Sequence, residues 1–104
     1  METLRQKQSR FVSMVGMLIS YASLRGYELT FGDAYRDPRC PYGHTKSLHK
    51  IRLAIDINVF KEGEYLSESG QYDDLGKFWK SIGGSWGGDF GDDNHFSLSH
   101  NGVD

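Results

Sequence analysis

Two histidines and two aspartates stand in sequence settings that could support metal chemistry. They are His49, Asp56, Asp92 and His95. A catalytic zinc ion takes three protein ligands and leaves its fourth position to water, and mixed sets of imidazole and carboxylate are among the known solutions. His49, Asp56 and His95 supply such a set. Asp92 is a second carboxylate, close enough in sequence to His95 to act as a base. These residue types therefore fit a hydrolase.

Asp56 lies in a segment that has the period of a strand. Large aliphatic residues occupy every second position of residues 53–59, which predicts a strand with one buried face. The Asp56 side chain would then point away from the main core and line a cleft. A structural ion pair with Arg52 or Arg36 is the alternative role for this carboxylate.

Asp92 and His95 follow a glycine-rich stretch and precede a short strand candidate at residues 95–98. Glycine lets the backbone pass close to a ligand or metal without a Cβ in the way. Asp89 and Asp93 are rival bases in the same loop, and the three-residue offset from His95 favours Asp92.

Length and composition describe one ordinary globular domain, over residues 1–104. The chain has room for a single core, with 38% hydrophobic and 25% charged residues. A formal net charge of −2 gives no electrostatic footprint for nucleic acid, so we expect no such partner. Cys40 is the only cysteine, so a metal site must use histidine and carboxylate.

The apolar N-terminal segment is either an amphipathic helix or a secretion signal. Its apolar residues recur at spacings of three and four, namely Leu4, Phe11, Val15, Leu18, Ile19 and Ala22. This spacing predicts one apolar stripe of a helix. Ser13 and Gly16 interrupt the stretch, which disfavours a signal peptide. No segment is long enough to span a bilayer, so we expect no membrane insertion.

The periodic segments and turn residues predict two helices and several strands. The expected helices span residues 3–25 and 73–82, and the expected strands span residues 27–31, 53–59, 65–66 and 95–98. Gly26 and Gly83 would end the helices. This order predicts an α+β domain in which a small antiparallel sheet packs with helices.

The motifs resemble those of the family of zinc D-Ala-D-Ala carboxypeptidases and L-alanyl-D-glutamate endopeptidases. Ser47 and His49 form a Ser-x-His motif, Asp56 ends an Ala-x-Asp motif, and Asp92 and His95 form an Asp-x-x-His motif. That family includes VanX-type dipeptidases, VanY-type carboxypeptidases and many phage endolysins.

The fit looks best to the phage endolysin branch. Segments 27–36 and 79–90 carry that likeness, and the resemblance extends from the first helix to about Leu98. Two positions differ from other members, because many have glycine where this chain has Arg52, and other branches have glutamate where it has Asp92.

The resemblance implies a role for each matching residue. His49, Asp56 and His95 correspond to the ligands of one zinc ion, and the fold would be that of the D-Ala-D-Ala carboxypeptidase and hedgehog type. Asp92 corresponds to the catalytic acidic residue, and Ser47 to the serine beside the substrate. Arg36 corresponds to the arginine on the strand before the site, where a guanidinium could stabilise the oxyanion or anchor a substrate carboxylate.

The implied activity is hydrolysis of the L-alanyl-D-glutamate bond of peptidoglycan stem peptides by a phage or prophage lysis enzyme. A D-Ala-D-Ala carboxypeptidase with the same site is one alternative, and a non-catalytic zinc-containing wall-binding domain is another. The expected partner is the stem peptide. We expect a monomer that stays in the host bacterial cytoplasm until lysis, because the chain shows no convincing signal peptide.

Overall fold

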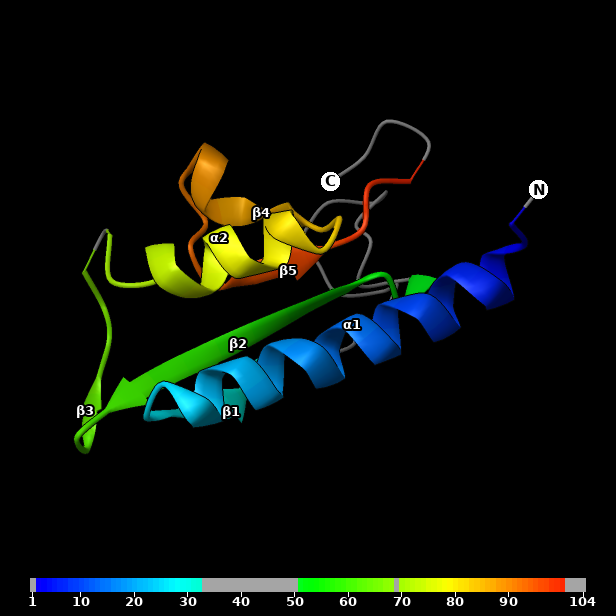
Figure 1. Ribbon diagram of the computed structural model, residues 1–104. Coiled ribbons are helices and arrows are strands. Elements are labelled where there is room, and N and C mark those ends of the chain that lie inside the picture. The colour runs from blue at the N-terminus through cyan, green and yellow to red at the C-terminus, as the bar shows by residue number, and fades with distance from the viewer. Residues whose placement is uncertain (1, 33–50, 69, 101–104) are drawn as a thin grey trace.

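The computed structural model describes residues 2–32, 51–68 and 70–100. Figure 1 shows the elements along the chain. In chain order they are α1 (Leu4–Leu24), β1 (Tyr27–Phe31), β2 (Ala54–Lys61), β3 (Glu64–Tyr65), α2 (Asp73–Ser81), β4 (Ser85–Trp86), the 3-10 helix η2 (Gly87–Phe90) and β5 (His95–Ser97). The expected helices and strands are all confirmed to within a few residues, whereas β4 and η2 were not predicted.

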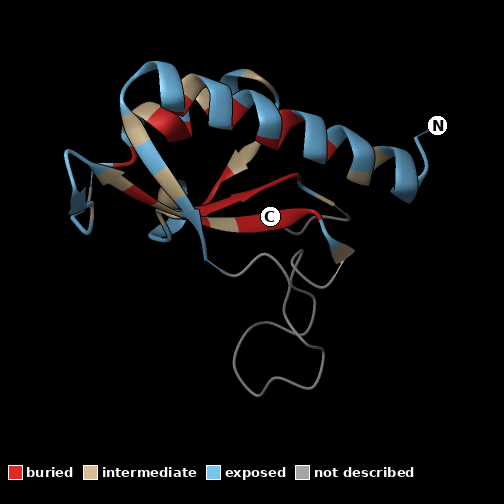
Figure 2. Ribbon diagram, turned by 90° about the horizontal axis from the view of Figure 1, so that it is seen from below, coloured by how far each residue is buried: buried red, intermediate tan, exposed pale blue. Residues whose placement is uncertain are grey.

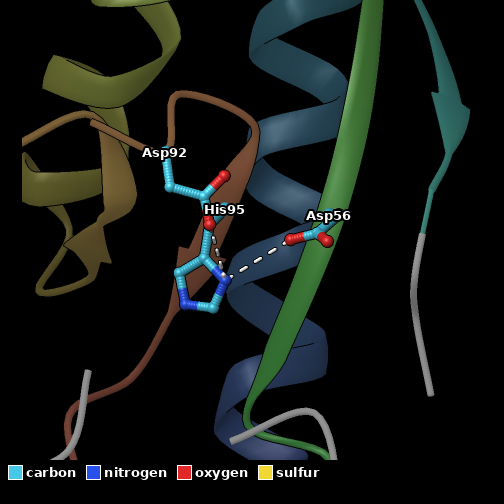
Figure 3. Close-up of side chains that lie close together, drawn as sticks. All are labelled: Asp56, Asp92 and His95. Carbon is cyan, nitrogen blue, oxygen red and sulfur yellow. Dashed lines mark ion pairs between the residues drawn. The ribbon is translucent and has the colours of Figure 1, made fainter. Parts of the chain in front are cut away.

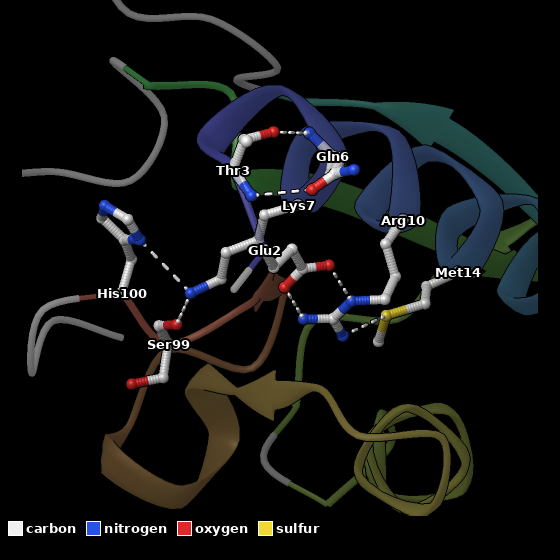
Figure 4. Close-up of polar contacts among 8 residues, drawn as sticks. All are labelled: Glu2, Thr3, Gln6, Lys7, Arg10, Met14, Ser99 and His100. Carbon is white, nitrogen blue, oxygen red and sulfur yellow. Dashed lines mark hydrogen bonds and ion pairs between the residues drawn. The ribbon is translucent and has the colours of Figure 1, made fainter.

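Helix α1 has clear start and stop signals. The Thr3 hydroxyl accepts a hydrogen bond from the backbone N–H of Gln6 at 3.1 Å, and the Gln6 side chain accepts one from the Thr3 N–H at 2.8 Å (Figure 4). This capping box satisfies two backbone donors that the first turn would otherwise leave unpaired. Gly26, with φ of 84°, adopts the left-handed conformation that ends the helix.

The sheet is antiparallel throughout, with strand order β1-β2-β5-β4 and with β3 also paired to β2. β2 is the longest strand and contacts three others, so it fixes the register of the whole sheet. Together with two helices this architecture confirms the predicted α+β fold.

The two faces of the sheet differ in chemistry. Ile55, Ile57 and Val59 of β2 are buried, whereas Asp56 and Asn58 between them are half-buried. This is the alternation that the sequence predicts, because successive side chains of a strand point to opposite faces. Figure 2 shows α1 lying along one side of the strands. The aliphatic face therefore packs on the helices, and the face that carries Asp56 points the other way.

Aromatic rings join the helices to the sheet. The Phe11 ring of α1 lies edge-on to the Trp79 ring of α2, with 5.7 Å between the ring centroids. Trp79 in turn lies edge-on to Phe96 of β5, with 5.9 Å between the ring centroids. The fully buried Trp79 indole also donates to the carbonyl of Ser97 at 2.9 Å. Trp79 is thus the centre of the core, where burial of so large a side chain contributes most.

The predicted apolar stripe of α1 is right in part. Phe11, Val15, Leu18 and Ala22 are buried together with Met14, whereas Leu4 and Ile19 are 42% and 41% exposed. Ile19 follows Leu18 directly, so it is rotated about 100° away from the buried face. No helix in the described part of the chain is long and apolar enough to cross a membrane.

Candidate metal centre

The pairing of β2 with β5 places Asp56 directly opposite His95 (Figure 3). The adjacent pair exchanges a backbone hydrogen bond from the Ile57 N–H to the Asn94 carbonyl at 2.9 Å. Because hydrogen-bonded and non-hydrogen-bonded pairs alternate in an antiparallel ladder, Asp56 and His95 occupy a non-hydrogen-bonded pair. In such pairs the Cα atoms are closer, so the two side chains meet on one face of the sheet.

The distance between these two side chains suits a shared metal ion. Asp56 Oδ1 is buried and lies 3.4 Å from His95 Nδ1. Two ligands of a tetrahedral zinc ion with bonds of about 2.0–2.2 Å stand about 3.3–3.6 Å apart. One imidazole nitrogen and one carboxylate oxygen at this separation, on a largely buried strand pair, therefore fit the chemistry of a zinc site.

Asp92 completes the group from the loop before β5. Asp56, Asp92 and His95 can each offer a ligand atom, and these three atoms lie within 4.8 Å of one another. Asp92 Oδ2 is 4.0 Å from His95 Nδ1, and the Asp92 side chain is 58% exposed. It is therefore both farther from the imidazole than Asp56 and open to solvent, so a water molecule at the centre could reach it.

The rival acidic residues of the same loop face elsewhere. Asp89 forms an ion pair with Lys80 at 3.1 Å. Asp93 lines a neighbouring cavity beside β3. Of the aspartates of the 89–93 loop, only Asp92 belongs to the group around His95 in the described structure.

Gly87 and Trp86 fix the loop that carries Asp92. The Asp92 N–H donates to the Gly87 carbonyl at 2.8 Å, and the His95 N–H donates to the Asp92 carbonyl at 3.1 Å. A Cβ on Gly87 would lie 2.2 Å from the Asp92 carbonyl oxygen and 2.7 Å from His95 Cβ. The Trp86 indole donates to the Asp93 carbonyl at 2.8 Å. This glycine of the glycine-rich stretch therefore permits a close approach within the loop itself.

Gly32 borders the other side of Asp56. Its N–H donates to the Asp56 carbonyl at 2.7 Å, and a Cβ there would stand 3.2 Å from Asp56 Cβ. The missing side chain leaves the face of the sheet beside the carboxylate uncrowded. Sequence reasoning missed Gly32, Trp86 and Gly87 as supports of the site. The Trp-Gly-Gly-Asp run was a usable signal for the last two.

Three of the predicted site residues lie outside the described residues. They are Arg36, Ser47 and His49. The structure therefore unites Asp56, Asp92 and His95 and describes nothing of the other three. Arg52, which was considered as a structural partner for Asp56, adopts a left-handed backbone with φ of 59°. This conformation is one that glycine favours, which matches the glycine expected at this position in many relatives.

Comparison with known proteins identifies a family for this chain. No curated protein sequence matches the chain. A family model described as D-alanyl-D-alanine carboxypeptidase matches residues 42–98, which is more than half of the 104 residues. The matched stretch contains Asp56, Asp92 and His95 but not α1, β1 or Arg36, so it is shorter than the resemblance noted in the sequence. On this match, the chain belongs to the D-alanyl-D-alanine carboxypeptidase family.

Proposed function

We propose that the protein is a zinc-dependent endopeptidase of the phage endolysin type that hydrolyses the L-alanyl-D-glutamate bond of peptidoglycan stem peptides. Family membership makes it a metallopeptidase of a peptidoglycan-acting, zinc-dependent group. The observation that carries the proposal is the approach of Asp56 to His95 at 3.4 Å with Asp92 beside them. The resemblance of segments 27–36 and 79–90 to endolysins supports the choice of bond.

In this proposal Asp56, His95 and His49 hold one zinc ion. When bound, zinc would supply a Lewis acid and lower the pKa of water toward about 7. The β2–β5 ladder fixes the backbones of Asp56 and His95, and both side chains are largely buried, so their ligand atoms already lie close together before an ion binds. His49 is assigned by its sequence motif.

Asp92 serves as the general base and then as the general acid. Its exposed carboxylate takes a proton from the attacking water, whose oxygen bonds to the peptide carbonyl carbon, and returns that proton to the leaving nitrogen as the C–N bond breaks. The products are a new C-terminal carboxyl group and a free amine. Aspartate is shorter than the glutamate of other branches. The tight turn held by the Gly87 carbonyl and the Trp86 indole compensates by fixing where its backbone lies.

Arg36 and Ser47 complete the proposed site on the substrate side. The permanently charged guanidinium of Arg36 stabilises the developing oxyanion or anchors a carboxylate of the stem peptide. Ser47 contacts the substrate next to the scissile bond. We further propose a monomeric single domain over residues 1–104 that remains in the host cytoplasm until lysis.

The alternative is a D-Ala-D-Ala carboxypeptidase, the activity after which the matching family is named. The chemistry and the residues would be the same, and only the bond at the site would differ. Digestion of purified sacculi followed by mass spectrometry of the new termini separates the two. The endopeptidase exposes an N-terminal D-glutamate, whereas the carboxypeptidase releases free D-alanine. Release of neither product would contradict both.

The same digestion with Asp92→Asn tests the catalytic assignment. We expect kcat to fall by about 10²–10⁴-fold, the usual contribution of a positioned acid–base group, while zinc content is unchanged. Asp89→Asn is the matched control, because Asp89 lies three residues away and pairs with Lys80. Full lytic activity of a zinc-loaded Asp92→Asn variant would show that Asp92 is not the acid–base group, whereas a zinc-loaded wild-type protein that releases no product would favour the non-catalytic binding domain.

A further inference from the structure

A polar cavity of about 350 Å³ lies beside the candidate metal centre, on the side of β3 and the start of α2. Its size is in the range of pockets that hold small ligands or single side chains. Residues from three segments line it, including Tyr65, Glu68, Tyr72, Gly91, Asp93 and Asn94. The last three belong to the loop that carries Asp92, so the cavity and the metal centre share a wall.

The cavity lies in line with the strands that carry the metal centre. Val59 of β2 forms part of its support, because its N–H donates to the Tyr72 hydroxyl at 3.1 Å and its carbonyl accepts from the Leu66 N–H at 2.8 Å. Between Val59 and Asp56, the Asn94 amide donates to Asn58 at 3.4 Å. With a rise of about 3.4 Å per residue, Val59 stands about 10 Å along β2 from Asp56.

An extended peptide covers a similar distance in two or three residues. A stem peptide whose scissile bond lies at the metal centre would therefore place a neighbouring side chain, within three residues of that bond, at the cavity. In the proposed cleavage of the L-alanyl-D-glutamate bond, the diamino acid is the second residue after the scissile bond, which is within this reach.

The lining selects for positive charge. It offers the carboxylates of Glu68 and Asp93, the amide of Asn94 and the half-exposed ring of Tyr65, which is 51% exposed. Among the described residues that line the cavity there is no lysine, arginine or histidine. A primary ammonium group has three N–H donors and no acceptor, so it matches acceptor oxygens, and it also gains from an exposed aromatic face.

We propose that this cavity is a specificity subsite for the side-chain ammonium group of a diamino acid in the stem peptide. The inference rests on the proposed function, including the choice of bond, because the diamino acid follows the L-alanyl-D-glutamate bond but precedes the D-alanyl-D-alanine bond. Glu68 and Asp93 contact the ammonium group, and Tyr65 covers its methylene chain. A carboxylate side chain is rejected there, because two like charges in the cavity would repel it.

The test uses a synthetic pentapeptide, L-Ala-γ-D-Glu-L-Lys-D-Ala-D-Ala, with the lysine side-chain amine either free or acetylated. Acetylation removes the charge and keeps the chain. We expect it to raise KM roughly tenfold, as for loss of a hydrogen bond between charged groups, with kcat changed less than about twofold. Glu68→Gln combined with Asp93→Asn should bring the KM ratio of the two peptides to about one.

Glu28→Gln is the matched control. Glu28 is exposed on β1 of the same sheet and does not line the cavity, so this variant should keep the wild-type KM ratio. Equal KM values for the two peptides with the wild-type enzyme would overturn the subsite alone. Hydrolysis of neither peptide would instead contradict the proposed function, so the two failures are distinguishable.

Discussion

Asp56 and His95 lie side by side because they are cross-strand partners on β2 and β5, whereas Asp92 reaches them from the loop before β5. The alternation of residues 53–59 was enough to predict that Asp56 leaves the core face. The sequence could not predict that His95 would be its cross-strand partner, because register depends on the whole sheet. The rigid pair suits metal ligands, and the exposed Asp92 suits proton transfer.

Arg52 allows a test of backbone strain just before β2. Its φ of 59° lies in the left-handed region, where a side chain costs about 1 kcal/mol relative to glycine. We expect Arg52→Gly to be about 1 kcal/mol more stable than Arg52→Ala, measured as the free energy of unfolding in urea. Both variants lose the same guanidinium, so their difference isolates the backbone. Equal stability would mean that this conformation carries no strain.

At the scale of elements, the loop between α2 and β5 is held by tryptophan rings that pack on glycines. A Cβ on Gly76 of α2 or on Gly88 of η2 would lie within 2.4 Å of Trp86 ring atoms, and a Cβ on Gly84 would do the same to Trp79. The Trp86 ring therefore lies against α2 and its N–H holds the Asp93 carbonyl. Packing of the second helix is thus connected directly to the position of Asp92.

Trp86→Phe removes this indole N–H and keeps an aromatic ring. We expect kcat on sacculi or stem peptide to fall about tenfold or more with little change in KM, because a small displacement of a catalytic group is costly. Trp79→Phe is the matched control, since its indole donates to the Ser85 and Ser97 carbonyls, away from Asp92. Both variants should lose stability. If kcat falls equally in both, at a temperature where both are folded, Trp86 has only a structural role.

The elements themselves were largely predictable from sequence, for local reasons. Thr3 and Gly26 mark the ends of α1, and the alternation around Asp56 marks β2. The two-residue strand β4 and the 3-10 helix η2 were not predictable, since so short a segment has no periodicity. Ala54 lies on the same face of β2 as Asp56 but is only 1% exposed, and its cross-strand partner Ser97 is fully buried, so this face is covered at the start of β2. The roles of Arg36, Ser47 and His49 stay predictions.

At the scale of the whole molecule, Asp74 connects α2 to α1 and β1. It accepts hydrogen bonds from the Tyr21 hydroxyl at 2.6 Å and the Tyr27 hydroxyl at 3.3 Å, and it forms an ion pair with Arg25. Partial burial acts to raise the pKa of Asp74, but the hydrogen bonds from Tyr21 and Arg25 outweigh it and hold the pKa below its ordinary value. The folded chain therefore favours the charged carboxylate.

This lowered pKa makes stability depend on pH. Asp74 contributes fully above the pKa of the unfolded chain, about 3.9, and loses its contribution as the pH falls through the lower folded value. We expect Asp74→Asn to cost about 1–2 kcal/mol at pH 7, as for other hydrogen bonds to a charged group. Urea unfolding should show that the difference in free energy of unfolding between the wild type and Asp74→Asn becomes smaller below pH 4. Asp73→Asn, in the same first turn of α2, is the control for the helix dipole. A difference in free energy of unfolding that stays constant with pH would contradict the lowered pKa of Asp74.

The cross-strand position of Asp56 and His95 also connects metal affinity to folding. The two residues are far apart in sequence and come together only when β2 pairs with β5, so an unfolded chain does not present them as a pair. By thermodynamic linkage, an ion that binds only the folded chain at 100 times its dissociation constant adds about 2.7 kcal/mol to stability. A change that opens the β2–β5 ladder in a fraction of the molecules would then weaken apparent ion binding in proportion to the paired fraction that is lost, even if it touches no ligand.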